Sequence, residues 1–300
     1  MTVDEKFMSQ ALELARLGGR AVAPNPMVGA VIVKGGKVIG KGYHQQFGGP
    51  HAEVNAVQSV KRKADLDGAT MYVTLEPCRH FGKTPPCLDF VRVMGVGRVV
   101  CGSQDPFQKI RNPKPETRNK LKFLKGPVAK QCRDLNKFYF TRIIKKRPYI
   151  TVKIAMSADG FVAGVNGEPV RFTNAKQDRE VHKLRAEHQA IMVGSNTVLK
   201  DNPHLGVRLA EGGDPLRVIL DSKNRIPKKA KVFRDHNVLH INKKTTLKKL
   251  FAHLASIGIG SVLVEPGPTL YHSLKKAGLI DELIVYRGRR RLGHGLPIHL

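Results

Sequence analysis

The sequence contains no tryptophan, only four cysteines among 300 residues, and fewer than half as many acidic residues as basic ones. Four cysteines in a chain of this length cannot form the disulfide framework of a small secreted domain. No uninterrupted apolar stretch approaches the roughly 20 residues that a membrane-spanning helix needs. The N-terminus, MTVDEKFMSQ, also lacks the apolar core of a secretory signal. We therefore expect a cytoplasmic protein without a membrane span.

The scarcity of acidic residues leaves a large positive charge, because 52 lysines and arginines stand against 24 acidic residues and give +28. Residues 109–147 alone contain fourteen of the basic residues and two of the acidic ones. Such charge suits nucleic acid or an acidic substrate, and it also suits a lysine-rich composition spread over solvated surfaces. No nucleic-acid motif or row of interleaved aromatic residues accompanies it. We expect no nucleic-acid partner and at most an attraction for a phosphorylated substrate.

The pattern of apolar residues predicts two α/β domains, a division typical of this length. The first is expected over residues 1–146 and the second over residues 147–300, with a basic linker region at 106–147 where the periodicity weakens. In the first domain an opening helix precedes the order β-β-α-β-α-β, which predicts a three-layer α/β fold. Its expected elements are residues 7–17, 28–34, 37–43, 51–63, 70–76, 85–95 and 97–103.

The second domain is expected to be another α/β unit that begins at YITVKIAMS. Short runs of β-branched and aliphatic residues alternate in it with helical apolar spacing. Its expected strands are residues 149–157, 189–195, 215–222, 237–243, 261–266 and 281–287, and its expected helices lie near 175–187, 245–256 and 268–277.

The strongest chemical signal is His51-Ala52-Glu53, followed by Cys78 after a proline and then by Cys87. Zinc accepts imidazole and thiolate ligands, and a catalytic zinc site keeps three protein ligands and one position for water. Cys78 closes an expected strand, whereas His51 and Cys87 open expected helices, whose positive N-terminal potential favours thiolates. Zinc lowers the pKa of its water, and Glu53 is the expected general base and acid.

Each of these four residues taken alone would more often have a structural role, but their order and their strand–helix setting favour a zinc-dependent deaminase. The other two cysteines, Cys101 in an apolar strand and Cys132 in the basic region, are expected to be structural.

The spacing of the two cysteines indicates the kind of deaminase. Two intervening residues are typical of cytidine or tRNA-adenosine deaminases, whereas this chain has eight between Cys78 and Cys87. The chain resembles the bifunctional deaminase–reductases of riboflavin biosynthesis, the RibD type, as far as about Asp105 and again from Pro148 to about Tyr286. In the first half the segments that carry this resemblance are Pro24–Gly29, Gly42–His44, Pro50–Glu53 and Glu76–Cys87.

The resemblance implies a cytidine-deaminase-like fold with one zinc ion per chain, bound by His51, Cys78 and Cys87. It also implies a substrate, a diaminopyrimidinone with a ribosylamino 5-phosphate, whose exocyclic amine is hydrolysed to give the aminouracil. An amide offers a donor and an acceptor to a ring edge, and a lysine offers a cation to phosphate. By the family pattern the substrate contacts are Asn25, His44, His80, Lys83 and Asp105.

The second half resembles the matching reductase, which implies a dihydrofolate-reductase-like fold that uses NADPH to reduce the ribosyl group to ribityl. The matching segments are Lys153–Gly160, Leu184–Ala186, Val193–Pro203, Leu220–Ser222 and Val264–Leu270. The resemblance assigns the phosphosugar substrate to Arg185, Leu205, Arg208 and Glu265. It assigns NADPH to Ala155, Arg171, Thr197, Asp201, Ser222 and the turn that begins with Gly267, Pro268 and Thr269. A strand-to-helix turn of that kind suits a pyrophosphate.

Three departures from the family pattern concern the reductase and the deaminase pocket. Arg171 stands where the family has a tryptophan facing the nicotinamide, so a flat apolar wall is replaced by a charge. Residues 287–293 replace the family's closing segment, which predicts a C-terminally short domain with an unfinished sheet. Residues 107–112 replace a glycine-rich segment. We expect an active deaminase joined to a reductase that is impaired, inactive or completed by a partner chain, and a homodimer is compatible with this.

Two other functions stay open at the level of sequence. A nucleoside or tRNA base deaminase would share His51-Ala52-Glu53 and the positive charge, but the eight-residue cysteine gap and the reductase-like half argue against it. A decayed, non-catalytic basic binding protein would explain the charge and the altered segments. The complete set of zinc ligands argues against that alternative.

Overall fold

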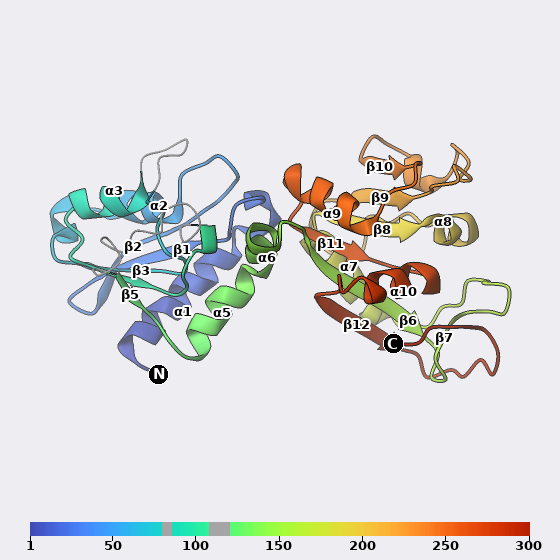
Figure 1. Cartoon of the computed structure of the whole chain (residues 1–300). Coiled ribbons are helices and arrows are strands. Elements are labelled where there is room, and N and C mark those ends of the chain that lie inside the picture. Colours follow the sequence, from blue (N-terminus) through green and yellow to red (C-terminus); the bar gives the residue numbers. More distant parts are fainter. Residues whose placement is uncertain (80–85, 108–120) are drawn as a thin grey trace. The chain divides into compact units, whose positions relative to one another are not determined.

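The computed structural model describes residues 1–79, 86–107 and 121–300, which form two compact units, Met1–Ile144 and Lys145–Leu300 (Figure 1). Each unit is a β-sheet with helices on both faces. Within the described residues, no helix has the length and apolar character required to cross a bilayer.

The sheet of the Met1–Ile144 unit has the order β2-β1-β3-β4-β5. Strand β1 is antiparallel to both β2 and β3, and β3, β4 and β5 are parallel. Consequently β2, β3 and β4 all point the same way. The strands are β1 (Gly29–Lys34), β2 (Lys37–Tyr43), β3 (Thr70–Val73), β4 (Arg98–Cys101) and β5 (Leu121–Phe123).

The helices of this unit cover both faces of its sheet. Buried residues of α2 and α3 pack against one face, and those of α1 and α5 pack against the other. The expected three-layer α/β fold is therefore confirmed. The described helices are α1 (Val3–Arg16), α2 (Ala52–Gln58), α3 (Cys87–Val93), α5 (Pro127–Leu135) and α6 (Lys137–Lys145), with short 3₁₀ turns at Gly19–Val22 and Lys63–Leu66.

Local sequence signals explain where these elements begin and turn. Helix α1 begins at Val3, earlier than the expected residue 7, because Thr2 and Glu5 form a capping box. The expected hairpin between β1 and β2 is confirmed, since Gly35 and Gly36 both have positive φ values, 56° and 75°. Helix α2 ends at Gln58, short of the expected residue 63.

The prediction of a linker over residues 106–147 is wrong for the part that the structure describes from residue 121 onward. Strand β5 adds to the sheet, and α5 buries Ala129 and Cys132 against the face that α1 covers. The concentration of basic residues hid this pattern, because lysine and arginine on the solvent side of short amphipathic helices resemble an unstructured charged run.

The sheet of the Lys145–Leu300 unit has six parallel strands in the order β10-β9-β8-β11-β6-β12. Helices α9 and α10 pack on one face, and α7 and α8 pack on the other. The strands are β6 (Tyr149–Met156), β8 (Ala190–Gly194), β9 (Leu216–Leu220), β10 (Val238–Ile241), β11 (Ser261–Val264) and β12 (Glu282–Arg287). The helices are α7 (Ala175–Glu187), α8 (Ser195–Asp201), α9 (Leu247–Ser256) and α10 (Pro268–Lys276).

Every strand and helix expected in this second unit forms, within a few residues of its expected ends. The sequence pattern missed α8 and a small antiparallel pair, β7 (Phe161–Ala163) and β13 (Leu296–Pro297). Strands of two or three residues carry too few alternations for a pattern to be recognised.

Asp4 joins α1 to three strands of the first unit and provides a test of this packing. Its carboxylate accepts hydrogen bonds of 2.8 Å from Tyr72, Arg98 and Lys122. Burial alone would raise the pKa of Asp4, but the hydrogen bonds from Lys122, Tyr72 and Arg98 lower it to about 2. A carboxyl group with a lowered pKa stabilises the fold above its unfolded pKa of about 3.9, and this contribution is lost as the pH falls toward 2.

We predict that Asp4→Asn destabilises the protein at pH 7 by up to about 2 kcal/mol. The difference between wild type and variant should shrink below pH 4, as melting temperatures measured between pH 7 and pH 3 would show. Asp134→Asn is the control. Asp134 and its ion-pair partner Lys130 are both exposed to solvent, and exposed ion pairs contribute little to the free energy of unfolding. A difference that is independent of pH would contradict the assigned role of Asp4.

Candidate functional site

The candidate deaminase site lies where chain segments meet at one edge of the first sheet. Because β2, β3 and β4 point the same way, their carboxyl ends lie at a common edge, together with the amino end of the antiparallel β1. His44 follows β2, Cys78 follows β3 and Asp105 follows β4. Asn25 belongs to the segment that leads into β1. The topology thus gathers residues that are far apart in the sequence.

The three predicted metal ligands are brought together at this edge. The ligand atoms of His51, Cys78 and Cys87 lie within 4.8 Å of one another. His51 Nδ1 is 3.1 Å from Cys87 Sγ and 3.8 Å from Cys78 Sγ. His51 is the N-cap of α2, and Cys87 is the first residue of α3. One imidazole nitrogen and two sulfurs fit the donor preference of zinc and leave a fourth position for water.

The surroundings of the Cys78 sulfur favour a thiolate. The Cys87 backbone N–H donates to Cys78 Sγ over 3.2 Å, and hydrogen bonds from Cys87 and His51 lower the pKa of the Cys78 thiol. Both cysteines are free of disulfides. Its hydrogen bond with Cys78 and its burial raise the pKa of the Cys87 thiol. A bound metal cation would lower the pKa of both thiols, so that the pair could serve as metal ligands.

Glu53 lies in the first turn of α2 with only 3% of its surface exposed. Burial, followed by the charge of Cys78, raises the pKa of its carboxyl group to about 7. A carboxyl group with that pKa can both accept and release a proton near neutral pH. Glu53, His51 and Cys78 line one cavity of about 340 Å³.

His44 and Asn25 face this cavity as a hydrogen-bonded pair. His44 Nδ1 lies 2.9 Å from the Pro50 carbonyl oxygen, which can only accept, so Nδ1 carries the proton. His44 Nε2 then accepts from Asn25 Nδ2 over 3.2 Å. Burial lowers the pKa of His44, as expected for a neutral ring. His44 therefore fixes the orientation of the Asn25 amide, a role that the sequence did not predict.

Asp105 also lines the cavity, and hydrogen bonds from two other residues hold its carboxylate in place. Its Oδ1 accepts from the Phe107 backbone N–H and from the Tyr139 hydroxyl over 3.1 Å. The predicted contacts His80 and Lys83 lie outside the described residues.

Sequence reasoning missed Tyr139 and Arg142, which line the cavity from α6. Their spacing of three residues was the available signal, because positions i and i+3 share one side of a helix. The interpretation of this segment as a linker hid that signal.

The candidate reductase site is a second cavity, of about 380 Å³, in the Lys145–Leu300 unit. It brings together four predicted residues, Ala155, Arg171, Arg185 and Arg208, and one that sequence reasoning missed, Lys153. A lysine inside the apolar strand β6 was the signal for the missed residue, because charged side chains are rare in buried strands without a partner.

The partner of Lys153 is Glu265, which forms ion pairs with both Lys153 and Arg185. Arg185 Nε and Nη2 donate to its two carboxylate oxygens over 2.9 Å and 3.2 Å, and Lys153 Nζ lies 3.0 Å from Oε2. Burial raises the pKa of Glu265, but Lys153 and Arg185 outweigh it and lower the pKa to about 2. Two cations against one carboxylate leave the cavity positive, which suits a phosphorylated ligand.

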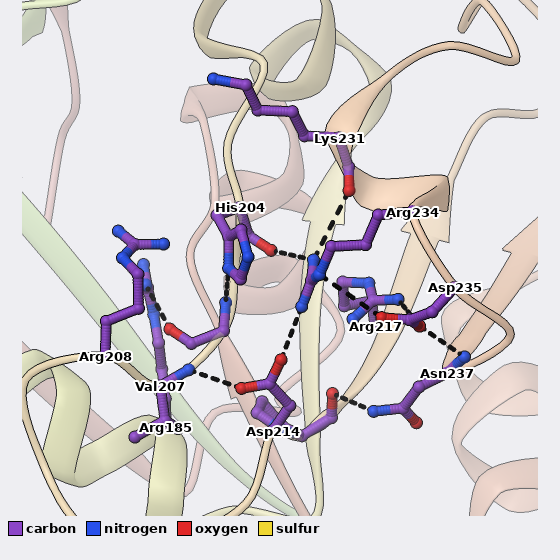
Figure 2. A network of polar contacts seen from close by, with 12 residues as sticks. Arg185, His204, Val207, Arg208, Asp214, Arg217, Lys231, Arg234, Asp235 and Asn237 are labelled. Carbon is purple, nitrogen blue, oxygen red and sulfur yellow. Dashed lines mark hydrogen bonds and ion pairs between the residues drawn. The ribbon is translucent and has the colours of Figure 1, made fainter.

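A polar network shapes the loop that carries Leu205 and Arg208 (Figure 2). Arg234 donates to the His204 carbonyl and to Asp214, each over 2.6 Å, and Asp214 accepts from the Val207 backbone N–H. Leu205 is buried and has a positive φ of 59°, a backbone conformation that only such a network holds. Arg185 also donates to the Gly206 carbonyl, so loop and cation site are connected.

Six of the predicted NADPH residues follow the carboxyl ends of parallel strands, where α/β sheets bind nucleotides, whereas Ala155 lies within β6 and Arg171 precedes α7. Thr197 and Asp201 follow β8, Ser222 follows β9, and Gly267, Pro268 and Thr269 follow β11. A Cβ atom on Gly267 would lie 4.0 Å from Thr197 Oγ1, so these two turns are neighbours. Helix α10 begins at Pro268 without a side-chain cap, so its first N–H groups suit a pyrophosphate.

Comparisons with known proteins find relatives for both halves of the chain. The RibD C-terminal domain matches residues 148–297, and the cytidine and deoxycytidylate deaminase zinc-binding region matches residues 1–103. The chain is 38% identical to the riboflavin biosynthesis protein RibD of Aquifex aeolicus, over 99% of this chain and 90% of that protein. It is 37% identical to RibD of Escherichia coli, over 97% and 89%.

Solved structures give the same result. The deaminase/reductase of Thermotoga maritima superposes with a TM-score of 0.89 at 36% identity, over 99% of this chain and 89% of that one. Acinetobacter baumannii RibD superposes with a TM-score of 0.88 at 33% identity, with the same coverage. The chain therefore belongs to the RibD family of riboflavin-biosynthesis proteins, whose members join a zinc-binding pyrimidine deaminase to an NADPH-dependent reductase.

Proposed function

We propose that the first unit hydrolyses the exocyclic amine of a diaminopyrimidinone that carries a ribosylamino 5-phosphate, with His51, Cys78 and Cys87 as the zinc ligands. The observation that carries this proposal is the convergence of one imidazole, two thiols and the buried Glu53 carboxyl at one cavity. The substrate follows from the Thermotoga relative, whose name is diaminohydroxyphosphoribosylaminopyrimidine deaminase.

Held by His51, Cys78 and Cys87, a zinc ion would act as a Lewis acid that makes water a better nucleophile near neutral pH. Glu53 accepts the proton of the attacking water, delivers it to the ring nitrogen and then assists the departure of ammonia. Its burial keeps the carboxyl group away from bulk solvent, so that the proton stays within the site. Asn25, held by His44, orients the ring through its amide, and Asp105 provides an acceptor on the opposite chain segment.

The second unit is proposed to reduce the ribosyl group of the resulting aminouracil, with NADPH supplying the hydride. Arg185, Arg208 and Lys153 give the cavity the positive charge that a phosphosugar requires. Glu265 orients two of these cations through direct ion pairs. The turns at Thr197, Ser222 and Gly267 would hold the cofactor at the carboxyl edge of the sheet.

Neither a nucleoside or tRNA deaminase nor a non-catalytic binding protein is favoured, because the relatives match both halves of the chain as RibD. We further propose a cytoplasmic location, which the four free cysteines support. The homodimer stays a prediction, and sedimentation equilibrium of the purified chain would test it.

Replacing Glu53 provides the direct test of the deaminase. We predict that Glu53→Gln lowers ammonia release from the diaminopyrimidinone phosphate by roughly 100-fold or more, while zinc content stays near one per chain. Cys78→Ser should lose both zinc and activity. Glu13→Gln is the matched control, because that carboxylate is exposed on α1. Full activity in Glu53→Gln would exclude Glu53 as the proton carrier.

Arg171 allows a test of the expectation that the reductase is impaired. Its guanidinium lines the reductase cavity and pairs with Asp178, whereas the family has a flat aromatic wall there. We predict that Arg171→Trp speeds NADPH oxidation with the aminouracil phosphate, because an aromatic ring packs against the nicotinamide. Arg179→Trp, on the exposed side of α7, is the control. Unchanged or slower oxidation in Arg171→Trp would show that Arg171 does not limit the reductase.

A further inference from the structure

Helix α6 forms a wall of the deaminase cavity and makes hydrogen bonds to two of its edges. Asn136, just before α6, donates to the Met27 carbonyl over 2.9 Å and accepts from the Met27 N–H over 2.8 Å. Tyr139 donates to Asp105, and Arg142 Nη2 donates to the Pro24 carbonyl over 3.1 Å. These three residues, spaced three apart, connect the segment around Asn25 with the segment that follows β4.

Arg142 differs from the other two because it brings a charge into the cavity. Its guanidinium is partly buried and lines the cavity. Nε is buried and has no hydrogen-bond acceptor among the residues that the structure describes. No carboxylate among the described residues forms an ion pair with it. Burial lowers the pKa of Arg142, in agreement with a cation whose desolvation is uncompensated.

A partly desolvated cation without a counter-ion is costly unless a ligand supplies the opposite charge. Apart from the bond to Pro24, the guanidinium N–H groups make no hydrogen bond to a described residue. Arginine is well suited to phosphate, because its planar group offers several donors at fixed angles and stays charged at neutral pH.

We propose that Arg142 binds the phosphate of the pyrimidine substrate and thereby makes the deaminase selective for the phosphorylated form. This inference rests on the proposed deaminase function and adds a phosphate contact from α6. Since the phosphate is remote from the reacting carbon, the contact acts mainly on binding, and its loss should raise KM more than it lowers kcat.

A purely structural role is the competing explanation, because Arg142 also supports the Pro24 carbonyl next to Asn25. That role would affect every substrate in the same way. The two explanations therefore differ in how the variants treat a substrate with and without its phosphate.

The experiment compares full-length wild type, Arg142→Gln, Arg142→Lys and Arg133→Gln, the last being an exposed arginine on α5 as control. Ammonia release is measured with the diaminopyrimidinone ribosylamino 5-phosphate and with its dephosphorylated analogue. We expect Arg142→Gln to raise KM for the phosphate by at least 10-fold and to leave KM for the analogue within about 2-fold. Arg142→Lys should recover part of the loss, and Arg133→Gln should resemble wild type.

Equal losses on both substrates, or no loss on either, would overturn the proposal. Ribose 5-phosphate titrated calorimetrically into the same four proteins gives a readout without turnover. The reductase unit can bind the same probe, so the expected result is one binding event fewer in Arg142→Gln than in Arg133→Gln. If wild type releases no ammonia, the proposed function fails, and the titration alone decides whether Arg142 binds phosphate. Equal stoichiometry in the two variants would then contradict the inference.

Discussion

The common direction of β2, β3 and β4 is the constraint on which the deaminase site depends. Because their carboxyl ends share one edge, His51, Cys78 and Asp105 arrive there from three separate loops. His51 is the N-cap of α2 and Cys87 is the first residue of α3, so two of the proposed metal ligands lie at helix N-termini. The positive potential at a helix N-terminus favours negative charge on a neighbouring ligand atom. The strand directions of the sheet therefore determine which residues meet at the deaminase site.

The second unit has a different electrostatic arrangement, which we propose serves the same kind of phosphorylated ligand. Its parallel sheet offers loops at one edge, but the key interaction is buried and ionic, with Glu265 between Arg185 and Lys153. Removing one partner of such a set leaves a charge unpaired in the interior, which is strongly destabilising. The loop that carries Leu205 and Arg208 is connected to this set through Gly206 and is shaped by Asp214 and Arg234 (Figure 2). The residues proposed to bind the substrate therefore also stabilise the fold of this unit.

Much of this could be predicted from the sequence wherever residue type and spacing carry the information. His51, Glu53, Cys78 and Cys87 were identifiable because zinc chemistry tolerates few substitutes at those positions. The strands of the second unit were identifiable from short runs rich in β-branched and aliphatic residues. The roles of His44 and Arg142 could not be predicted, because they depend on which carbonyl oxygens lie within 3.1 Å after folding. Helix α6 was misinterpreted because a charged run obscured its spacing, and contacts from Lys83 lie outside the described residues.

The central claim is that His51, Cys78 and Cys87 bind one zinc ion and leave a position open at the cavity that Glu53 lines. Zinc-edge X-ray absorption of the purified full-length protein tests this most directly, because it separates sulfur ligands from nitrogen or oxygen ligands and counts each kind. The account predicts two sulfurs at about 2.3 Å, one nitrogen at about 2.0 Å and one further light atom from water. A shell without sulfur, or one closed by four sulfur and imidazole ligands, would contradict it.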